Sequence, residues 1–96
     1  MTKDERILKF RTELNQKYSE LCFSIKKDKK FIRQNLRNVL TVISWNMDLL
    51  EELPSDELYM ALNVIRLARS QGYIKYSDLY NSEIFTKLDE SYGKSR

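Results

Sequence analysis

The first half of the chain is interrupted at Lys26-Lys27-Asp28-Lys29-Lys30, where a regular spacing of apolar residues stops. Four lysines in five positions repel one another, and Asp28 is suited to cap a helix that follows it. Without a turn here, residues 4–53 would form a rod about 75 Å long at about 1.5 Å per residue, which a monomer cannot bury. The stretch therefore predicts that the chain folds back on itself. One straight helix in a coiled-coil dimer is the alternative.

Amphipathic helices are predicted on both sides of this turn, over residues 4–26 and 31–53. The second is apolar over a wider part of its circumference, which predicts contact with two neighbouring helices. The apolar face of the first comprises Ile7, Leu14, Tyr18, Leu21 and Ile25. That of the second comprises Ile32, Leu36, Val39, Leu40, Ile43, Met47, Leu50 and Leu53, with Val42, Trp45 and Leu49 beside it.

The chain has only one proline and two glycines, whereas a sheet of this size would need more frequent turns. Pro54 is expected to end the second helix, and Ser55 to cap a third helix over residues 56–70. Gly72 then stands where a left-handed residue would close that helix.

The last part of the chain predicts a fourth helix. After a short extended link at 73–76, this helix is expected to begin at Ser77 and to end before Gly93, while residues 94–96 fray. Its apolar positions are Leu79, Tyr80, Ile84, Phe85 and Leu88. The sequence therefore predicts an all-α fold, an antiparallel four-helix bundle, in which residues 1–96 form a single domain.

The composition is that of a globular protein, with 42% hydrophobic and 32% charged residues. Its longest apolar run, residues 58–62, is far shorter than the roughly 18 residues of a membrane-spanning helix. No apolar segment follows Met1-Thr2-Lys3-Asp4-Glu5-Arg6, so no secretory signal is visible. A cytoplasmic protein is expected.

The inventory of side chains argues against an enzyme. The chain contains no histidine, no Gly-rich phosphate loop, and one cysteine, Cys22, which we expect to be buried and inert. A single cysteine also excludes an internal disulfide. Four carboxylates near the second turn are expected to decorate helix ends rather than to hold a metal: Glu51, Glu52, Asp56 and Glu57. We therefore predict no catalytic residue, no metal, no cofactor and no small-molecule substrate.

Two groups of side chains are candidates for binding a macromolecule. Basic residues gather in the segment 26–37, in a chain whose net charge is +3. They could follow a phosphate backbone, or form the polar exterior of a turn and the next helix, and both interpretations stay open.

The second group is aromatic. Four of the six tyrosines follow Gly72, at Tyr73, Tyr76, Tyr80 and Tyr92, and Phe85 joins them. Tyrosine suits interfaces because it offers a large rigid face and a polar tip. The alternative is that these rings close one end of the bundle.

A local resemblance covers residues 34–53. The pattern Leu36-Arg37-Asn38, Leu40-Thr41, Ile43-Ser44 and Leu49-Leu50 resembles the phosphoacceptor helix of sensor histidine kinases. However, Gln34 replaces the family's histidine, Asn35 its acidic residue and Val39 its usual proline. These departures exclude phosphotransfer. Two interpretations of the match stay open: the shared demands of an amphipathic bundle helix, or a kinase-dimerisation mimic.

A second resemblance covers the whole chain in length and layout. The segments Gln71-Gly72-Tyr73-Ile74 and Tyr76-Ser77-Asp78-Leu79, with Tyr92-Gly93, resemble the immunity proteins of pediocin-like (class IIa) bacteriocins. The resemblance implies an antiparallel four-helix bundle in the producer's cytoplasm that binds the complex of bacteriocin and sugar-transporter receptor from inside. In that family the C-terminal half carries partner specificity. By position, it implies partner-binding roles for Tyr73, Tyr76, Tyr80, Phe85, Lys87 and Tyr92.

Two other functions remain open at this stage. One is a DNA-associated or signalling regulator built on a dimeric helical bundle, for which nucleic acid would be the partner. The other is a small phage or accessory protein that inhibits a host factor. A protein partner and a monomeric chain are expected, with a dimer as the alternative.

Overall fold

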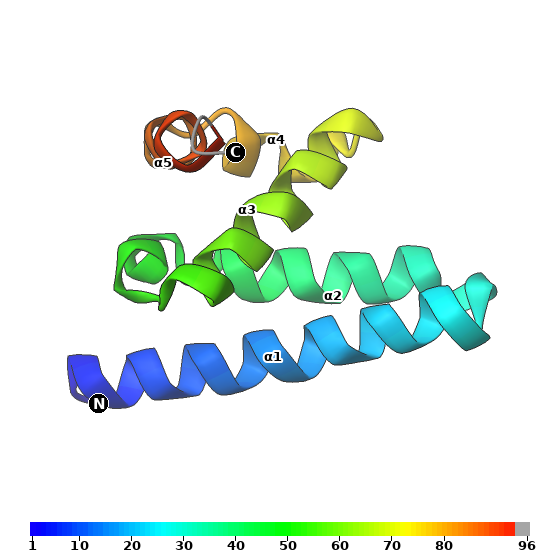
Figure 1. Cartoon of the computed structure of the whole chain (residues 1–96), viewed down its shortest axis with the longest axis horizontal. Coiled ribbons are helices and arrows are strands. Elements are labelled where there is room, and N and C mark those ends of the chain that lie inside the picture. The colour runs from blue at the N-terminus through cyan, green and yellow to red at the C-terminus, as the bar shows by residue number, and fades with distance from the viewer. Residues whose placement is uncertain (94–96) are drawn as a thin grey trace. The chain divides into compact units, whose positions relative to one another are not determined.

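The computed structural model describes residues 1–93, and within this range every regular element is a helix (Figure 1). The predicted all-α class is therefore confirmed. The chain folds as two compact units: the N-terminal unit, Met1–Leu53, and the C-terminal unit, which begins at Pro54. No helix in the described range combines the length and apolarity needed to cross a bilayer. The expected fraying of residues 94–96 lies outside that range.

The N-terminal unit is built on a helical hairpin. Helix α1 (Lys3–Lys27) and helix α2 (Ile32–Ser44) lie side by side and run in opposite directions (Figure 1). The short 3₁₀-helix η1 (Lys29–Phe31) joins them, so the predicted reversal at the lysine-rich stretch is confirmed. Asp28 ends α1 through its backbone: its N–H donates to Ser24 O at 2.9 Å, and its C=O accepts from Phe31 N at 3.0 Å. The expected side-chain cap by Asp28 is absent, because these backbone bonds close the turn.

The start of α1 carries a capping box. The Thr2 hydroxyl accepts from Glu5 N at 3.2 Å, and the Glu5 carboxylate accepts from Thr2 N at 3.2 Å. The hydrogen bonds from Thr2 lower the pKa of the Glu5 carboxyl. Two backbone N–H groups at the start of α1 thus find hydrogen-bond partners within the first turn itself.

The buried face of α1 differs in part from the predicted one. Leu14 and Leu21 are buried as expected, but Phe10 and Ser24 join them and Ile25 is exposed. The interior stripe runs through positions 10, 14, 21 and 24, and Ile25 lies at its edge, about 100° from Ser24 around the helix axis. On α2 the buried residues are Leu36, Val39, Leu40, Val42 and Ile43. Cys22 is half-buried rather than buried as expected. The pKa of the neighbouring Tyr18 hydroxyl is raised, mainly because the side chain is partly buried and secondly because the Cys22 thiol lies beside it.

The second predicted helix, residues 31–53, is wrong beyond Ser44. Backbone angles leave the helical range at Asn46, whose side chain donates to Val42 O at 2.8 Å. The chain continues as a 3₁₀-helix, η2 (Met47–Glu52), that still buries Leu49 and Leu50. Trp45, expected beside the apolar face, is 71% exposed at this break.

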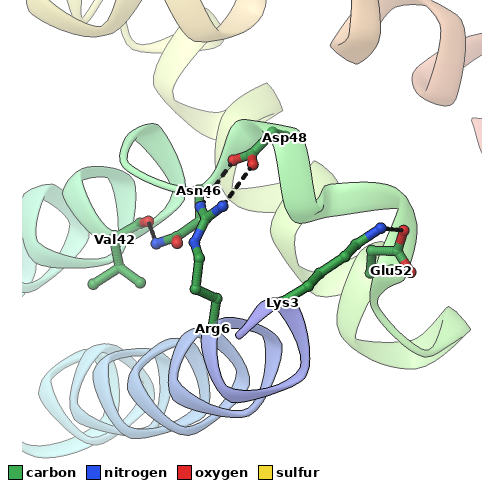
Figure 2. A network of polar contacts seen from close by, with 6 residues as sticks. All are labelled: Lys3, Arg6, Val42, Asn46, Asp48 and Glu52. Atoms are coloured by element: carbon green, nitrogen blue, oxygen red, sulfur yellow. Dashed lines mark hydrogen bonds and ion pairs between the residues drawn. The ribbon is translucent and has the colours of Figure 1, made fainter. Parts of the chain in front are cut away.

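Two ion pairs join η2 to the first turns of α1 (Figure 2). Arg6 donates two hydrogen bonds to the Asp48 carboxylate, at 3.0 and 3.2 Å, and Lys3 Nζ lies 3.0 Å from Glu52 Oε1. The bonds from Arg6 lower the pKa of the Asp48 carboxyl, and the same contact raises the pKa of the guanidinium. All four side chains remain partly exposed, so these pairs orient η2 more than they stabilise it.

The C-terminal unit begins with helix α3 (Ser55–Ser70), close to the predicted span of 56–70. Pro54, rather than Ser55, is the capping residue, because its carbonyl accepts the first helical bond from Leu58 N at 2.9 Å. The buried face of α3 comprises Leu58, Ala61, Leu62, Val64, Ile65 and Ala68.

Gly72 closes α3 in the predicted manner. Its φ is +68°, its N–H donates to Arg69 O at 3.1 Å, and Tyr73 N donates to Ala68 O at 3.0 Å. These two bonds form a Schellman motif, which requires a left-handed residue at this position. The turn therefore fixes the position of the Tyr73 backbone relative to the end of α3.

The predicted extended link and the single fourth helix are wrong in detail. The link contains a 3₁₀-helix, η3 (Ile74–Tyr76), followed directly by α4 (Ser77–Tyr80) and then by α5 (Glu83–Gly93). The break before α5 arises because the Ser82 hydroxyl accepts from Phe85 N at 3.2 Å, as a helix cap does. An ion pair between Arg66 and Asp89 joins α3 to α5.

Candidate interaction surfaces

The aromatic residues of the C-terminal unit divide into interior and surface positions. Tyr76 and Phe85 are only 8% and 1% exposed, so both side chains belong to the packed interior. The Arg69 guanidinium lies 5.6 Å from the centroid of the Phe85 ring, within cation–π range. These two rings support the surface around them and are not themselves available to a large partner.

Tyr73 and Tyr80 are half-buried and lie close together. The Tyr80 hydroxyl donates to the Tyr73 carbonyl at 3.5 Å, a long hydrogen bond that spans the η3 turn. Both side chains remain partly exposed, and a tyrosine that is partly exposed can offer a large apolar ring and a hydroxyl to a partner. The Schellman turn at Gly72 and the short helix α4 set their positions.

Lys87 and Tyr92 both lie on α5, where Lys87 is exposed and Tyr92 half-buried. They are five positions apart, which places them about 140° apart around the helix. They therefore do not share one face of α5. Of the six residues expected to bind a partner, Tyr73 and Tyr80 form the clearest pair.

Ile74 belongs to this surface and was missed by the sequence analysis. It follows Tyr73 in η3 and is 81% exposed, while Tyr76 beside it is buried. The available signal was an isolated aliphatic residue between tyrosines in a link between helices. We name Tyr73, Ile74 and Tyr80 the tyrosine surface. It offers apolar contact and hydroxyl groups, which suits binding rather than catalysis.

A second candidate surface lies at the turn of the α1–α2 hairpin. We name residues 19–35 the hairpin tip. A hollow of about 490 Å³ opens here, lined by Ser19, Glu20, Phe23, Ser24, Asp28, Phe31 and Asn35. Phe23 and Phe31 are 63% and 47% exposed, and Lys30 Nζ lies 5.2 Å from the centroid of the Phe31 ring.

The basic residues of the predicted segment 26–37 surround this hollow or lie just beyond it. All are exposed: Lys26, Lys27, Lys29, Lys30, Arg33 and Arg37. Within the hollow, Asn35 donates to the Glu20 carbonyl at 3.3 Å, and Lys17 Nζ lies 3.6 Å from the Glu20 carboxylate. The basic residues were found from sequence, but the exposure of Phe23 and Phe31 was not. The available signal was that neither residue belongs to a predicted apolar face.

Residues 1–93 contain no group of three or more acidic, cysteine or histidine side chains placed to hold a metal ion. Of the carboxylates gathered near the second turn, Glu52 is committed to its ion pair with Lys3. Comparison with protein-family models, curated proteins and solved structures finds no match for this chain.

Proposed function

We propose that the chain is a non-enzymatic binding protein that confers immunity to a pediocin-like bacteriocin by engaging the toxin–receptor complex from the cytoplasm. The observation that carries the proposal is the tyrosine surface, which follows the Schellman turn at Gly72 in the half of the chain where the resembled family carries its specificity. The proposal includes an antiparallel four-helix bundle formed by α1, α2, α3 and α5, in a chain that is a monomer.

Within this proposal the aromatic residues have different roles. Tyr73, Ile74 and Tyr80 contact the partner, and Lys87 and Tyr92, which lie on different faces of α5, contribute outside the tyrosine surface. Tyr76 and Phe85 act from the interior by holding η3, α4 and α5 in place. Binding of this kind needs no catalytic group and no cofactor.

The test is expression of the chain in a strain that pediocin-like bacteriocins kill. Cells that express it should survive at least one such peptide, and the variants Tyr73→Ala and Tyr80→Ala should lose protection. Trp45→Ala is the control, because it removes a more exposed aromatic ring from the N-terminal unit. Killing unchanged by every peptide tried would refute the immunity function, whereas full protection by both tyrosine variants would refute the surface.

One observation favours a second candidate, a DNA-associated regulator: the exposed basic residues of the hairpin tip. Salt-dependent binding to random duplex DNA would support it. The kinase-mimic version of this regulator has a weaker basis. Val39 is buried, Asn35 bonds to Glu20 O, and Gln34 donates to Asn38 at 3.0 Å on an exposed face. A tight dimer in sedimentation would be needed to favour it.

A further inference from the structure

We propose that the hairpin tip docks on the surface of an anionic lipid bilayer, with Phe23 and Phe31 entering the headgroup layer and the surrounding lysines contacting acidic lipids. This inference goes beyond the proposed function and does not depend on it. It combines a local concentration of positive charge with exposed aromatic rings at one end of one hairpin.

The net charge of the whole chain is concentrated in the hairpin tip. Residues 19–35 contain five basic side chains and two carboxylates, while the other residues contain twelve of each sign. All five basic side chains are exposed: Lys26, Lys27, Lys29, Lys30 and Arg33. A juxtaposed acidic lipid surface attracts such residues by about 1 kcal/mol each.

The side chains of Phe23 and Phe31 do not belong to the interior of the hairpin. The interior face of α1 is occupied by Leu14, Leu21 and Ser24, whereas Phe23 and Phe31 line an open hollow. Ile25, on another side of α1, is also about half exposed. Exposed aromatic and aliphatic residues between lysines are typical of segments that lie in a membrane interface.

The hollow itself favours a bilayer over nucleic acid. Glu20 and Asp28 line it beside Phe23 and Phe31, and although the Glu20 carboxylate already lies 3.6 Å from Lys17 Nζ, two acidic residues in the lining make it a poor site for a phosphate. A phosphate backbone would suit the lysines but would meet these carboxylates. A headgroup layer offers both signs of charge, because its ammonium groups can enter the hollow while its phosphates contact the lysines.

The first test measures co-sedimentation of the full chain with vesicles of phosphatidylcholine alone or with about 30% phosphatidylglycerol. We expect at least about tenfold tighter binding to the acidic vesicles, and a decrease in that binding as salt is raised. Equal partition to both compositions, or no binding to either, would overturn the proposal. Salt-sensitive binding to duplex DNA without binding to acidic vesicles would also overturn it, in favour of nucleic acid.

The second test uses variants of exposed residues, whose fold is checked by circular dichroism. Replacing Lys26, Lys27, Lys29 and Lys30 by Gln should weaken binding by about fivefold for each lysine. Phe23→Ser with Phe31→Ser should weaken it about tenfold, because two rings no longer leave water. The matched control is Leu8→Ser with Lys9→Gln, an exposed apolar–basic pair towards the other end of α1, which should bind as the parent does.

The third test asks which end of the hairpin enters the lipid. In a Trp45→Phe background, the single tryptophan is moved to the tip by Phe31→Trp or towards the other end of α1 by Leu8→Trp. Acidic vesicles should shift the fluorescence of the Phe31→Trp variant to the blue and leave the Leu8→Trp variant unchanged, since Leu8 lies about 22 Å from Phe23 along the helix. An unshifted Phe31→Trp variant, or binding by the lysine and phenylalanine variants equal to the parent's, would overturn the proposal. Bacteriocin survival is a separate readout, so the two proposals can fail independently.

Discussion

Arg6 and Asp48 are separated by 42 positions and joined by two parallel hydrogen bonds, 3.0 and 3.2 Å long. The two N–H groups of the guanidinium match the two oxygens of the carboxylate, so the contact fixes an orientation as well as a distance. It ties the 3₁₀-helix η2 to the first turns of α1, across the open end of the hairpin (Figure 2).

Asp48→Asn should lower the free energy of unfolding at pH 7 by a small amount, and the difference from the parent should vanish in acid. The pKa of Asp48 is lowered in the folded state, so its contribution is complete above the unfolded pKa of about 3.9 and is lost as the pH falls through the folded pKa. Urea unfolding followed by circular dichroism at several pH values measures this. Glu51→Gln, on the same 3₁₀-helix, is the control. A difference between parent and Asp48→Asn that does not decrease as the pH falls below the unfolded pKa of about 3.9 would contradict the prediction.

Leu14→Ala should cost about 2–5 kcal/mol of unfolding free energy, because Leu14 is fully buried between the hairpin helices. Leu8→Ala removes the same atoms from an exposed position on the same helix and should change stability by less than about 0.5 kcal/mol. Urea midpoints of both variants give the comparison. Similar losses for the two would mean that the buried face of α1 is wrongly assigned.

Gly72→Ala should destabilise the protein by about 1–2 kcal/mol through backbone conformation alone. The φ of Gly72 is +68°, and a Cβ placed there would meet no atom within 4 Å, so no steric clash contributes. Gly72→Asn should lose less, since asparagine tolerates the left-handed region. Thermal unfolding of the pair provides the check, and an alanine variant as stable as the asparagine variant would count against the Schellman assignment.

Ser82→Ala should cost about 1 kcal/mol, because it removes the hydroxyl that accepts from Phe85 N at the start of α5. Ser82→Asp should retain most of the stability, since its carboxylate can accept the same bond and suits the positive end of the helix. Helical ellipticity during urea unfolding distinguishes them. If Ser82→Ala and Ser82→Asp have the same free energy of unfolding, the Ser82 hydroxyl does not cap α5.

The sequence was sufficient for those features that depend on a local break or on regular spacing. The lysine-rich stretch located the reversal between α1 and α2, and Gly72 located the end of α3. The early end of α2 was not predictable from glycine or proline, since none occurs there. It depends on Asn46, whose side chain replaces a helical bond to Val42, and such competition is invisible in apolar spacing.

The candidate surfaces were predictable only in part. Tyrosine clustering identified Tyr73 and Tyr80, but Phe85 is buried, because position 85 on α5 packs with the interior. The exposure of Phe23, Phe31 and Ile74 was missed for a related reason. None of the three belongs to a predicted apolar face, and for such a residue only the packed neighbours determine whether the side chain is covered.

The short η1 connection also bears on the order of folding. Only residues 28–31 separate α1 from α2, so bringing these helices together costs little chain entropy. Asp48 can reach Arg6 only after the intervening segment has been ordered. The hairpin should therefore nucleate the N-terminal unit, with η2 docking last. Backbone amides of η2 should consequently exchange with deuterium sooner than those at the centre of α1.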